Sequence, residues 1–403
     1  MPIYRASWVL PISQPPIRDG WLRTDKGRIV EVGRDQPPLG DVVDLGNVAL
    51  LPGLVNAHTH LELSWMRGRI PQTDDFPTWI RQVISLQHSD LFTEDDKVNA
   101  MRRALDEAHA TGTRLFGDIS NTLSSVDVLI EKKAAGTVFF ELIGFRSDRA
   151  AAFLSSASDR VQMLPVAPDV HYSLAAHAPY SVSPALFRGI RQFVADRTMG
   201  PYSVHLGESR AETQFVEEGL GAWRALLENL GAWDSDWQPP GCRPVDYLNR
   251  LGFLGRDALV VHGVQFSPEE LSALHDTAAT LVTCPRGNRL TGAGSPPISD
   301  FYAAGIPVAL GTDSLASVPD LNLFNELAEL RRLAPQVEAR RFLESATLAG
   351  ARCLGFEDDF GSFQVGKKAA MTAVRLPASV GDVEEYLVGG VGAESINSVP
   401  DRS

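Results

Sequence analysis

Short apolar runs alternate with amphipathic stretches along most of this chain. The runs at 113–118, 202–206 and 258–262 have the length of buried strands. The stretches between such runs read as helices, and Thr93 with Asp96 forms a capping-box-like pattern at the start of one of them. Strands that alternate with helices favour a parallel sheet.

We count eight strand candidates in a core that spans residues 51–360. The strands are expected in the apolar run that leads into His58 and at 113–118, 137–143, 169–177, 202–206, 258–262, 280–284 and 307–312. The helices are expected at 93–110, from the end of the second strand to about 135, and at 183–196, 211–218, 267–277, 298–304, 323–333 and 337–350. Eight strand–helix units favour a closed (β/α)8 barrel, an α/β fold, and a doubly wound open sheet is the alternative.

The two ends of the chain have a different residue pattern from this core. Residues 4–10 and 28–32 are β-like and are separated by turns that contain Pro and Gly. The sequence becomes typical of β-strands again from about Gly361, most clearly at 367–374. We expect residues 1–50 and 361–403 to pair as one small domain beside the 51–360 barrel.

Composition narrows the function classes. The chain has 403 residues, of which 44% are hydrophobic and 22% charged, as in soluble globular proteins. Its net charge of -13 argues against nucleic acid and anionic membranes as partners. No apolar run approaches a membrane span, and the first residues lack a signal-peptide pattern. Three scattered cysteines fit a reducing cytoplasm better than a disulfide framework.

Polar residues follow several of the predicted strands at their carboxyl ends, which is where barrel enzymes carry their chemistry. His58 and His60 are two positions apart, so on a strand their side chains point to one face. His205, His262 and Asp313 close three further strands, and Glu208 comes three residues after His205.

These residues suit a metal site with an open position. His58, His60, His205 and Asp313 offer three neutral nitrogens and one carboxylate, a set that fits Zn²⁺ or Fe²⁺. A metal with a free coordination position lowers the pKa of a bound water. Glu208 is placed to take and return that water's proton, and His262 to hold the hydroxide or polarise the attacked atom.

The remaining histidines divide into two groups. His88, His109 and His275 fall in helical text and read as structural or solvated, and His171 reads as packing. His177 ends its strand within Ala176-His177-Ala178-Pro179, so it is either a substrate contact or a buried, hydrogen-bonded imidazole.

Four stretches resemble the amidohydrolase superfamily, and within it the branch of cytosine and nucleoside deaminases. They are Leu51-Pro52-Gly53-Leu54-Val55-Asn56-Ala57-His58-Thr59-His60, His205-Leu206-Gly207-Glu208, Val261-His262-Gly263 and Leu310-Gly311-Thr312-Asp313-Ser314. The resemblance covers nearly the whole chain. It implies a distorted barrel with a small β-sandwich, one divalent metal, a homodimer, and hydrolysis at an electrophilic carbon, usually deamination.

The lysines bear on the number of metals. Binuclear members of that superfamily bridge their metals with a carboxylated lysine, or a substitute, at the end of strand four. No lysine lies between residues 134 and 366 here, so one metal is favoured. Glu141 is the alternative group for recruiting a second.

Further stretches resemble the aminodeoxyfutalosine deaminases of the alternative menaquinone pathway, which act on a purine nucleoside. These are His60-Leu61-Glu62-Leu63-Ser64, His177-Ala178-Pro179-Tyr180-Ser181 and Cys284-Pro285-Arg286-Gly287-Asn288. Glu62 and Ser64 would meet the sugar or its arm, or Glu62 would only cap the following loop. Arg286 would pair with the substrate carboxylate or brace its own loop. Asn288 is interpreted as a loop residue.

Aromatic residues offer walls for a purine or aryl group, although core packing is the alternative for each. The candidates are Trp65, Phe145, Trp233 and Trp237, and the irregular stretch 231–244 is a candidate lid. Rival functions are deamination or hydrolysis of S-adenosylhomocysteine, adenosine, guanine, cytosine or a triazine. A non-catalytic barrel scaffold is the remote alternative.

Overall fold

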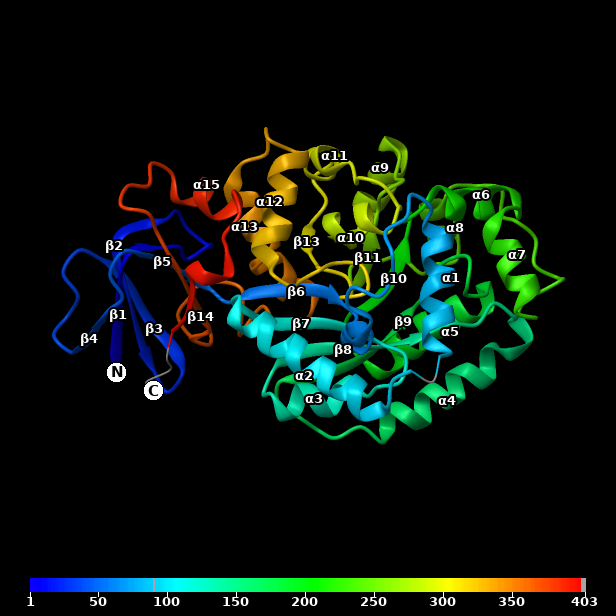
Figure 1. Ribbon diagram of the computed structural model, residues 1–403, viewed down its shortest axis with the longest axis horizontal. Coiled ribbons are helices and arrows are strands. Elements are labelled where there is room, and N and C mark those ends of the chain that lie inside the picture. Colours follow the sequence, from blue (N-terminus) through cyan, green and yellow to red (C-terminus); the bar gives the residue numbers. More distant parts are fainter. Residues whose placement is uncertain (90, 400–403) are drawn as a thin grey trace.

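Two sheets organise the chain in its computed structural model (Figure 1). The structure describes residues 1–89 and 91–399, so the last four residues of the segment predicted at 361–403 lie outside the described part. One sheet has eight strands ringed by helices. The other has seven strands and joins both ends of the chain beside that ring.

The eight-stranded sheet is a parallel barrel whose strands follow one another in sequence order. They are β6 (Leu54–Thr59), β7 (Thr113–Ser120), β8 (Ala135–Leu142), β9 (Val170–Ala176), β10 (Tyr202–Leu206), β11 (Ala258–His262), β12 (Thr280–Thr283) and β13 (Val308–Leu310). An isolated parallel bridge between Thr59 and Asp313 brings the first strand to the last. The predicted (β/α)8 barrel is confirmed, and this first-to-last contact excludes the open doubly wound sheet.

Helices surround the barrel and connect its strands. They are α1 (Phe76–Gln87), α2 (Glu94–Ala110), α3 (Ser125–Glu131), α4 (Ala150–Gln162), α5 (Pro184–Arg197), α6 (Arg210–Glu218), α7 (Ala222–Asn229), α8 (Pro244–Arg250), α9 (Pro268–Thr277), α10 (Pro285–Leu290), α11 (Ile298–Ala303), α12 (Leu323–Leu333), α13 (Ala339–Ser345) and α14 (Leu348–Cys353). Short 3-10 turns η1 (Leu61–Met66) and η2 (Ser147–Arg149) follow β6 and precede α4. Of the helices described, none is long and apolar enough to cross a bilayer.

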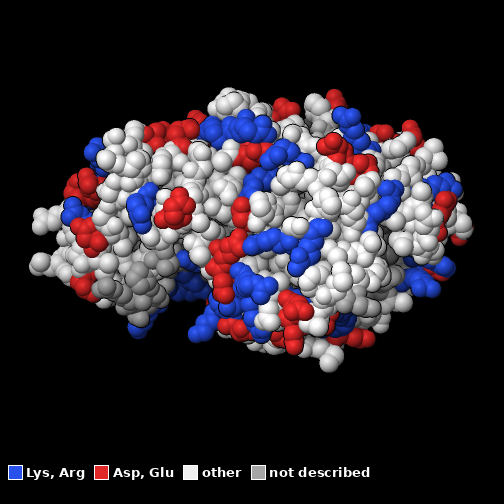
Figure 2. Space-filling model, viewed as in Figure 1, with Lys and Arg blue, Asp and Glu red and all other residues white. Residues whose placement is uncertain are grey.

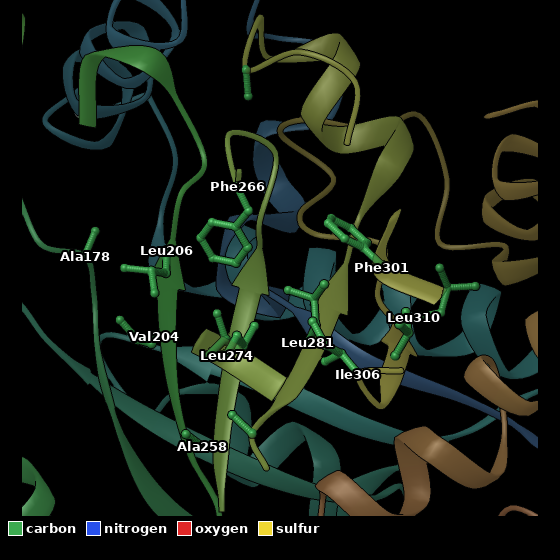
Figure 3. Close-up of a cluster of buried hydrophobic side chains, with 14 of the residues drawn as sticks. Ala178, Val204, Leu206, Ala258, Phe266, Leu274, Leu281, Phe301, Ile306 and Leu310 are labelled. Atoms are coloured by element: carbon green, nitrogen blue, oxygen red, sulfur yellow. The ribbon is translucent and has the colours of Figure 1, made fainter. Parts of the chain in front are cut away.

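Alternate residues of the barrel strands enter two different cores. Leu259 and Val261 of β11 pack with Val282 and Ala309 inside the barrel. Their neighbours on the other face of each strand pack outward against the helices (Figure 3). The outward set includes Val204, Leu206, Ala258, Leu281 and Leu310, with Leu274 of α9 and Phe301 of α11. Both faces are apolar, as expected for a parallel sheet covered by helices.

The second sheet joins strands from both ends of the chain in the order β15-β14-β5-β1-β2-β3, with β4 paired to β1. These strands are β1 (Pro2–Val9), β2 (Ile17–Asp25), β3 (Arg28–Arg34), β4 (Asp41–Asp44), β5 (Val48–Pro52), β14 (Met371–Arg375) and β15 (Ile396–Ser398). The predicted pairing of the two ends is confirmed by the antiparallel ladder of β14 on β5. Between β14 and β15, α15 (Val383–Val388) contacts α12 and α13 of the barrel, and η3 (Ala393–Ser395) follows it.

Several predicted elements differ from the structure in instructive ways. The single helix expected at 337–350 is two helices, because Thr347 leaves helical geometry with φ -139° and ψ -90°. The elements that were not predicted are the helices α1, α4, α7, α8, α10 and α15 and the strands β2, β4 and β15. The capping box of Thr93 and Asp96 is confirmed at the start of α2.

The barrel is closed by side chains as well as by its backbone. Asn56 in β6 donates its amide to Thr312 Oγ1 at 2.8 Å, and its carbonyl oxygen accepts from the Thr312 N–H at 3.1 Å. The N–H groups of Thr312 and Asp313 both reach the His58 carbonyl at 3.1 Å, and Thr59 Oγ1 donates to the Asp313 carbonyl at 2.9 Å. We refer to this set of contacts between β6 and the segment after β13 as the β6–β13 seam. All of its side chains are buried.

Replacing Asn56 tests the seam. Asn56→Ala removes two buried hydrogen bonds to Thr312 and the volume of the amide, so the free energy of unfolding should fall by about 2 kcal/mol. The comparison is made by calorimetry on metal-free protein, with Asn249→Ala on the exposed face of α8 as the matched control. An unchanged melting temperature for Asn56→Ala would show that the seam contributes nothing to stability.

Candidate active site

A bulge in β6 directs His58 and His60 toward the barrel axis. Val55 and Ala57 face the interior cluster, so uninterrupted alternation would turn His58 outward. The register with β7 instead shifts between Asn56 and Thr59, where three residues of β6 oppose two of β7. A bulge of this kind re-aims the side chains that follow it. The ring centroids of His58 and His60 consequently lie 4.9 Å apart.

His205 completes the group of nitrogens from the end of β10. Its ring centroid lies 5.0 Å from that of His58 and 5.4 Å from that of His60. One nitrogen of each of the three rings lies within 4.8 Å of the other two. His205 Nδ1 donates to the His177 carbonyl at 2.9 Å, which leaves Nε2 as an unprotonated donor to a metal.

Asp313 brings the carboxylate to this group. Its Oδ1 lies 3.6 Å from His60 Nε2 and 3.8 Å from His58 Nε2, and its Oδ2 accepts from Ser317 Oγ at 2.7 Å. Tetrahedral ligands at ordinary zinc distances are about 3.4 Å apart, close to these separations. The backbone of Asp313 has a φ of +62°, in the left-handed region, which turns the side chain back over the strand end.

The three imidazoles fit a divalent metal electrostatically. Burial and the neighbouring histidines hold the pKa of His58 well below its usual value, and burial lowers that of His205 to about 4. Neutral imidazole is the form that coordinates a metal. The buried His58 Nε2 has no hydrogen-bond partner among the described residues. A cation among these donors would satisfy that nitrogen.

Glu208 stands beside the donors on a loop held by a second glutamate. The Glu212 carboxylate accepts the N–H groups of Gly207 and Glu208 at 2.8 and 3.0 Å. Glu208 Oε1 lies 3.5 Å from His262 Nε2. Burial, followed by the charges of Asp313 and Glu212, raises the pKa of Glu208 well above its usual value, and the charge of a bound cation would oppose that shift.

His262 reaches the site through an unusual backbone conformation. Its φ of +82° lies in the left-handed region, and it follows Val261, whose side chain faces the barrel interior. The buried Asn288 presents its amide nitrogen 2.9 Å from His262 Nδ1. An amide nitrogen only donates, so Nδ1 is the acceptor and the proton sits on Nε2, facing Glu208.

These groups lie at the closed end of a cavity of about 440 Å³. Its polar end is lined by His60, Asn121, Glu141, His177, His205, Glu208, His262 and Asp313. Its apolar arm is lined by Phe76, Trp79, Ile80, Val83 and Ile84 of α1, by Trp223, Leu226 and Leu227 of α7, and by Leu230. Tyr180 stacks on Trp223 with ring centroids 3.8 Å apart. The histidines and carboxylates are thus gathered at one end of the cavity, while Arg146 and Arg149 line it elsewhere.

This arrangement can be compared with known proteins. The model of the amidohydrolase family matches residues 49–398. The chain belongs to the amidohydrolase family. It is 29% identical to a 5-methylthioadenosine/S-adenosylhomocysteine deaminase of Moorella thermoacetica over 97% of this chain and 90% of that protein. It is 30% identical to an aminodeoxyfutalosine deaminase of Nitratiruptor over 84% of this chain and 82% of that protein.

A solved relative bears on the metal. The structure of an adenosine deaminase from Xanthomonas campestris with bound zinc matches with a TM-score of 0.82 and 25% identity, covering 98% of this chain and 90% of that one. This likeness and the cluster of imidazole nitrogens support a divalent metal in the present amidohydrolase. The chain is accordingly a hydrolase.

Only some of the residues predicted to contact the substrate of this amidohydrolase line the cavity. His177 lines the cavity, and its Nδ1 is 2.6 Å from Ser181 Oγ. Glu62 does not line the cavity, because its carboxylate accepts from the loop after β7, including the N–H of Asn121 at 2.9 Å. Neither expectation for Glu62 describes this contact, because the loop that it holds follows β7 and not Glu62 itself.

Two further predicted contacts are corrected. The Trp65 ring packs on Phe92 with centroids 4.9 Å apart and lines a different cavity. Arg286 makes paired hydrogen bonds of 2.9 and 3.0 Å to Asp320, and its Nη1 lies 3.6 Å from Glu326. Because its charge is already matched twice, Arg286 braces its loop and does not face the cavity.

Some cavity residues were missed from the sequence. The aromatic stripe of α1, which includes Phe76 and Trp79, repeats at helical spacing after the N-cap Asp75 and was the signal available. Of the predicted aromatic walls, Phe145 lines the cavity, with Trp233 stacked on it and Trp237 packed edge-on against it. Within the predicted lid 231–244, the cavity is lined only by Gly231 and Ala232.

Removing one donor tests the metal site. His60→Ala should lower metal affinity by about 100-fold or more, because three remaining donors bind a divalent ion less well than four. Metal per chain after dialysis is measured by mass spectrometry, with His88→Ala, an exposed histidine at the end of α1, as the control. Equal metal in both variants would place the ion elsewhere.

Asn288→Asp tests how His262 is positioned. The introduced carboxylate accepts a proton, so the His262 proton should move to Nδ1 and leave Nε2 bare. The ¹⁵N shifts of the imidazole report the tautomer, and kcat should fall about 100-fold. Asn249→Asp serves as the control. A tautomer that stays the same in Asn288→Asp would contradict this account.

Proposed function

We propose that this amidohydrolase is a metal-dependent deaminase of adenine-bearing nucleosides. The observation that carries the proposal is the convergence of His58, His60, His205 and Asp313 beside Glu208 at the closed end of an apolar cavity. Names of relatives support the same class, since both reported sequence relatives are named as deaminases of adenosine-like compounds. A purine at the polar end of the cavity would bring its amino-bearing carbon beside Glu208 and these metal donors.

The chemistry follows from the placement of the side chains. A divalent ion held by the three histidines and Asp313 would supply Lewis acidity and a water that ionises near neutral pH. Glu208 takes one proton from the attacking water and passes it to the ring nitrogen beside the attacked carbon. His262 directs its Nε2–H at the oxygen as the carbon becomes tetrahedral. Asp313 moves the remaining proton to the amine, which leaves as ammonia.

Within this class we propose aminodeoxyfutalosine as the substrate, which would place the enzyme in the futalosine route to menaquinone. The apolar arm beyond the polar end suits an aryl substituent on the sugar. Arg149 lines the cavity where it reaches solvent and forms no ion pair or side-chain hydrogen bond with the described residues. We therefore assign the benzoate to Arg149 in place of Arg286, whose charge is matched by Asp320 and Glu326.

The second candidate is a 5-methylthioadenosine/S-adenosylhomocysteine deaminase. Its support is the 29% identity over 97% of the chain with the Moorella protein. The polar end of the cavity would accept the purine of either substrate. The group attached to the sugar, which would enter the apolar arm, therefore distinguishes the two candidates. Ammonia release from aminodeoxyfutalosine, methylthioadenosine, S-adenosylhomocysteine, adenosine and guanine, compared by kcat/KM, separates the candidates. The proposed homodimer is tested on the same sample by light scattering.

Glu208→Gln tests the proton transfer. The amide cannot accept the water's proton, so kcat should fall by about 1,000-fold while metal content is unchanged. Glu218→Gln, at the exposed end of α6, is the control and should retain full activity. Near-normal turnover in Glu208→Gln would rule out the proposed role.

Arg149→Gln tests the carboxylate subsite. Loss of a charge-assisted hydrogen bond at a solvent-exposed position should lower kcat/KM for aminodeoxyfutalosine about 5- to 10-fold and leave that for adenosine unchanged. Adenosine, which lacks the carboxylate, is the internal control. An equal loss for both substrates would show that Arg149 supports the fold and does not contact the benzoate.

A further inference from the structure

A second cavity lies on the other side of η1 from the residues that line the active site. Its volume is about 410 Å³, and no residue lines both cavities. Its walls are η1, the segment after η1, α2 and Leu315. Trp65, which was predicted to contact the substrate, lines this second cavity, and its ring packs on Phe92.

The lining of this second cavity is positively charged in an acidic protein. Arg67, Arg69 and Arg103 line it, and Asp96 is the one acidic residue among its described lining residues. Three positive charges against one negative leave +2, whereas the whole chain carries -13. Basic side chains gather on the face over α2 and the end of β6, with acidic ones between them (Figure 2).

The acidic groups nearby do not neutralise all three arginines. Arg67 is held by Glu107 at 2.6 Å, and the Arg69 guanidinium lies 4.5 Å from the centroid of the Phe92 ring. Within the described part of the chain, no hydrogen bond or ion pair holds the side chain of Arg103. The Asp96 carboxylate accepts from the backbone and hydroxyl of Thr93 in the capping box, and these bonds, followed by the nearby charge of Arg103, lower its pKa.

An independent observation comes from Ser64. Its side chain is 6% exposed and lines the cavity, and its hydroxyl has no hydrogen-bond partner among the described residues. A buried hydroxyl without a partner is costly, so a hydrogen bond to a bound group would offset that cost. Guanidinium groups and a hydroxyl donor together match a tetrahedral oxyanion.

We propose that this cavity binds a phosphate group, either as the free ion or as a phosphate monoester. Counted with Glu107, which pairs with Arg67, the site keeps an excess of one positive charge, which favours an anion such as phosphate. Arg103 and Arg69 supply unpaired donors, Arg67 is preoriented by Glu107, and Ser64 supplies the hydroxyl.

The position of the cavity couples it to catalysis. Ser64 comes four residues after His60, and Leu315 two residues after Asp313, so both segments that carry metal donors also form its wall. A phosphate that orders η1 would also restrict the loop that carries His60. Occupancy is therefore expected to alter kcat without competing with the nucleoside.

The test is calorimetric titration of the metal-loaded enzyme at constant ionic strength. Inorganic phosphate and ribose 5-phosphate form two arms that distinguish the free ion from an ester, and acetate is the planar-anion control. We expect one saturable site with a Kd of ~1 mM or tighter. Arg103→Gln should weaken binding at least 10-fold and Ser64→Ala about 3-fold.

Arg102→Gln is the matched control, because Arg102 is the neighbouring arginine of α2 and faces Glu131, outside the cavity. Equal phosphate binding by wild type, Arg103→Gln and Arg102→Gln would overturn the proposal, as would the absence of saturable heat in both arms. A change of oligomer mass in Arg103→Gln without loss of phosphate binding would overturn it in favour of an interface between copies. Because binding is read directly, these outcomes do not depend on which nucleoside is deaminated.

Discussion

Closure of the barrel at the β6–β13 seam is the constraint on which the active site depends. His58 and His60 lie at the start of the barrel, and Asp313 follows its last strand. The amide of Asn56, the hydroxyl of Thr59 and the His58 carbonyl all bond to residues 312–313. Because the bonds that close the sheet are made by the donor residues and their neighbours, the carboxylate reaches the imidazoles only when the fold is complete. Formation of the site is therefore coupled to completion of the barrel.

Regular strand geometry alone would not produce this site. A bulge in β6 re-aims His58, and left-handed backbone at His262 and Asp313 turns two more side chains over the mouth of the barrel. Such conformations cost about 1 kcal/mol or more each in residues other than glycine. They persist because buried partners hold the side chains, Asn288 for His262 and Ser317 for Asp313. The backbone strain at His262 and Asp313 is therefore offset by the hydrogen bonds that their side chains make with these partners.

The sequence predicts the barrel and its polar strand ends well, because both depend on local patterns. Strands 202–206 and 258–262 are apolar runs of the right length, and a polar residue that ends each run is visible without a structure. The substrate contacts fail for a physical reason. Arg286 is neutralised by Asp320 and Glu326, which lie beyond the next strand, and no local signal reports that pairing. Asn288 reads as a loop residue because its partner, His262, belongs to another strand.

The buried carboxylates give a further reason for the metal. Burial raises the pKa values of Glu141, Glu208 and Asp313, and the like charge of Glu141 raises those of Glu208 and Asp313 further. Ionised carboxylates without a cation are costly in such a place. A divalent ion offsets that repulsion and satisfies the free His58 Nε2. Metal affinity and folding stability should thus share one origin, since an ion that binds only the closed barrel stabilises the seam that formed its site.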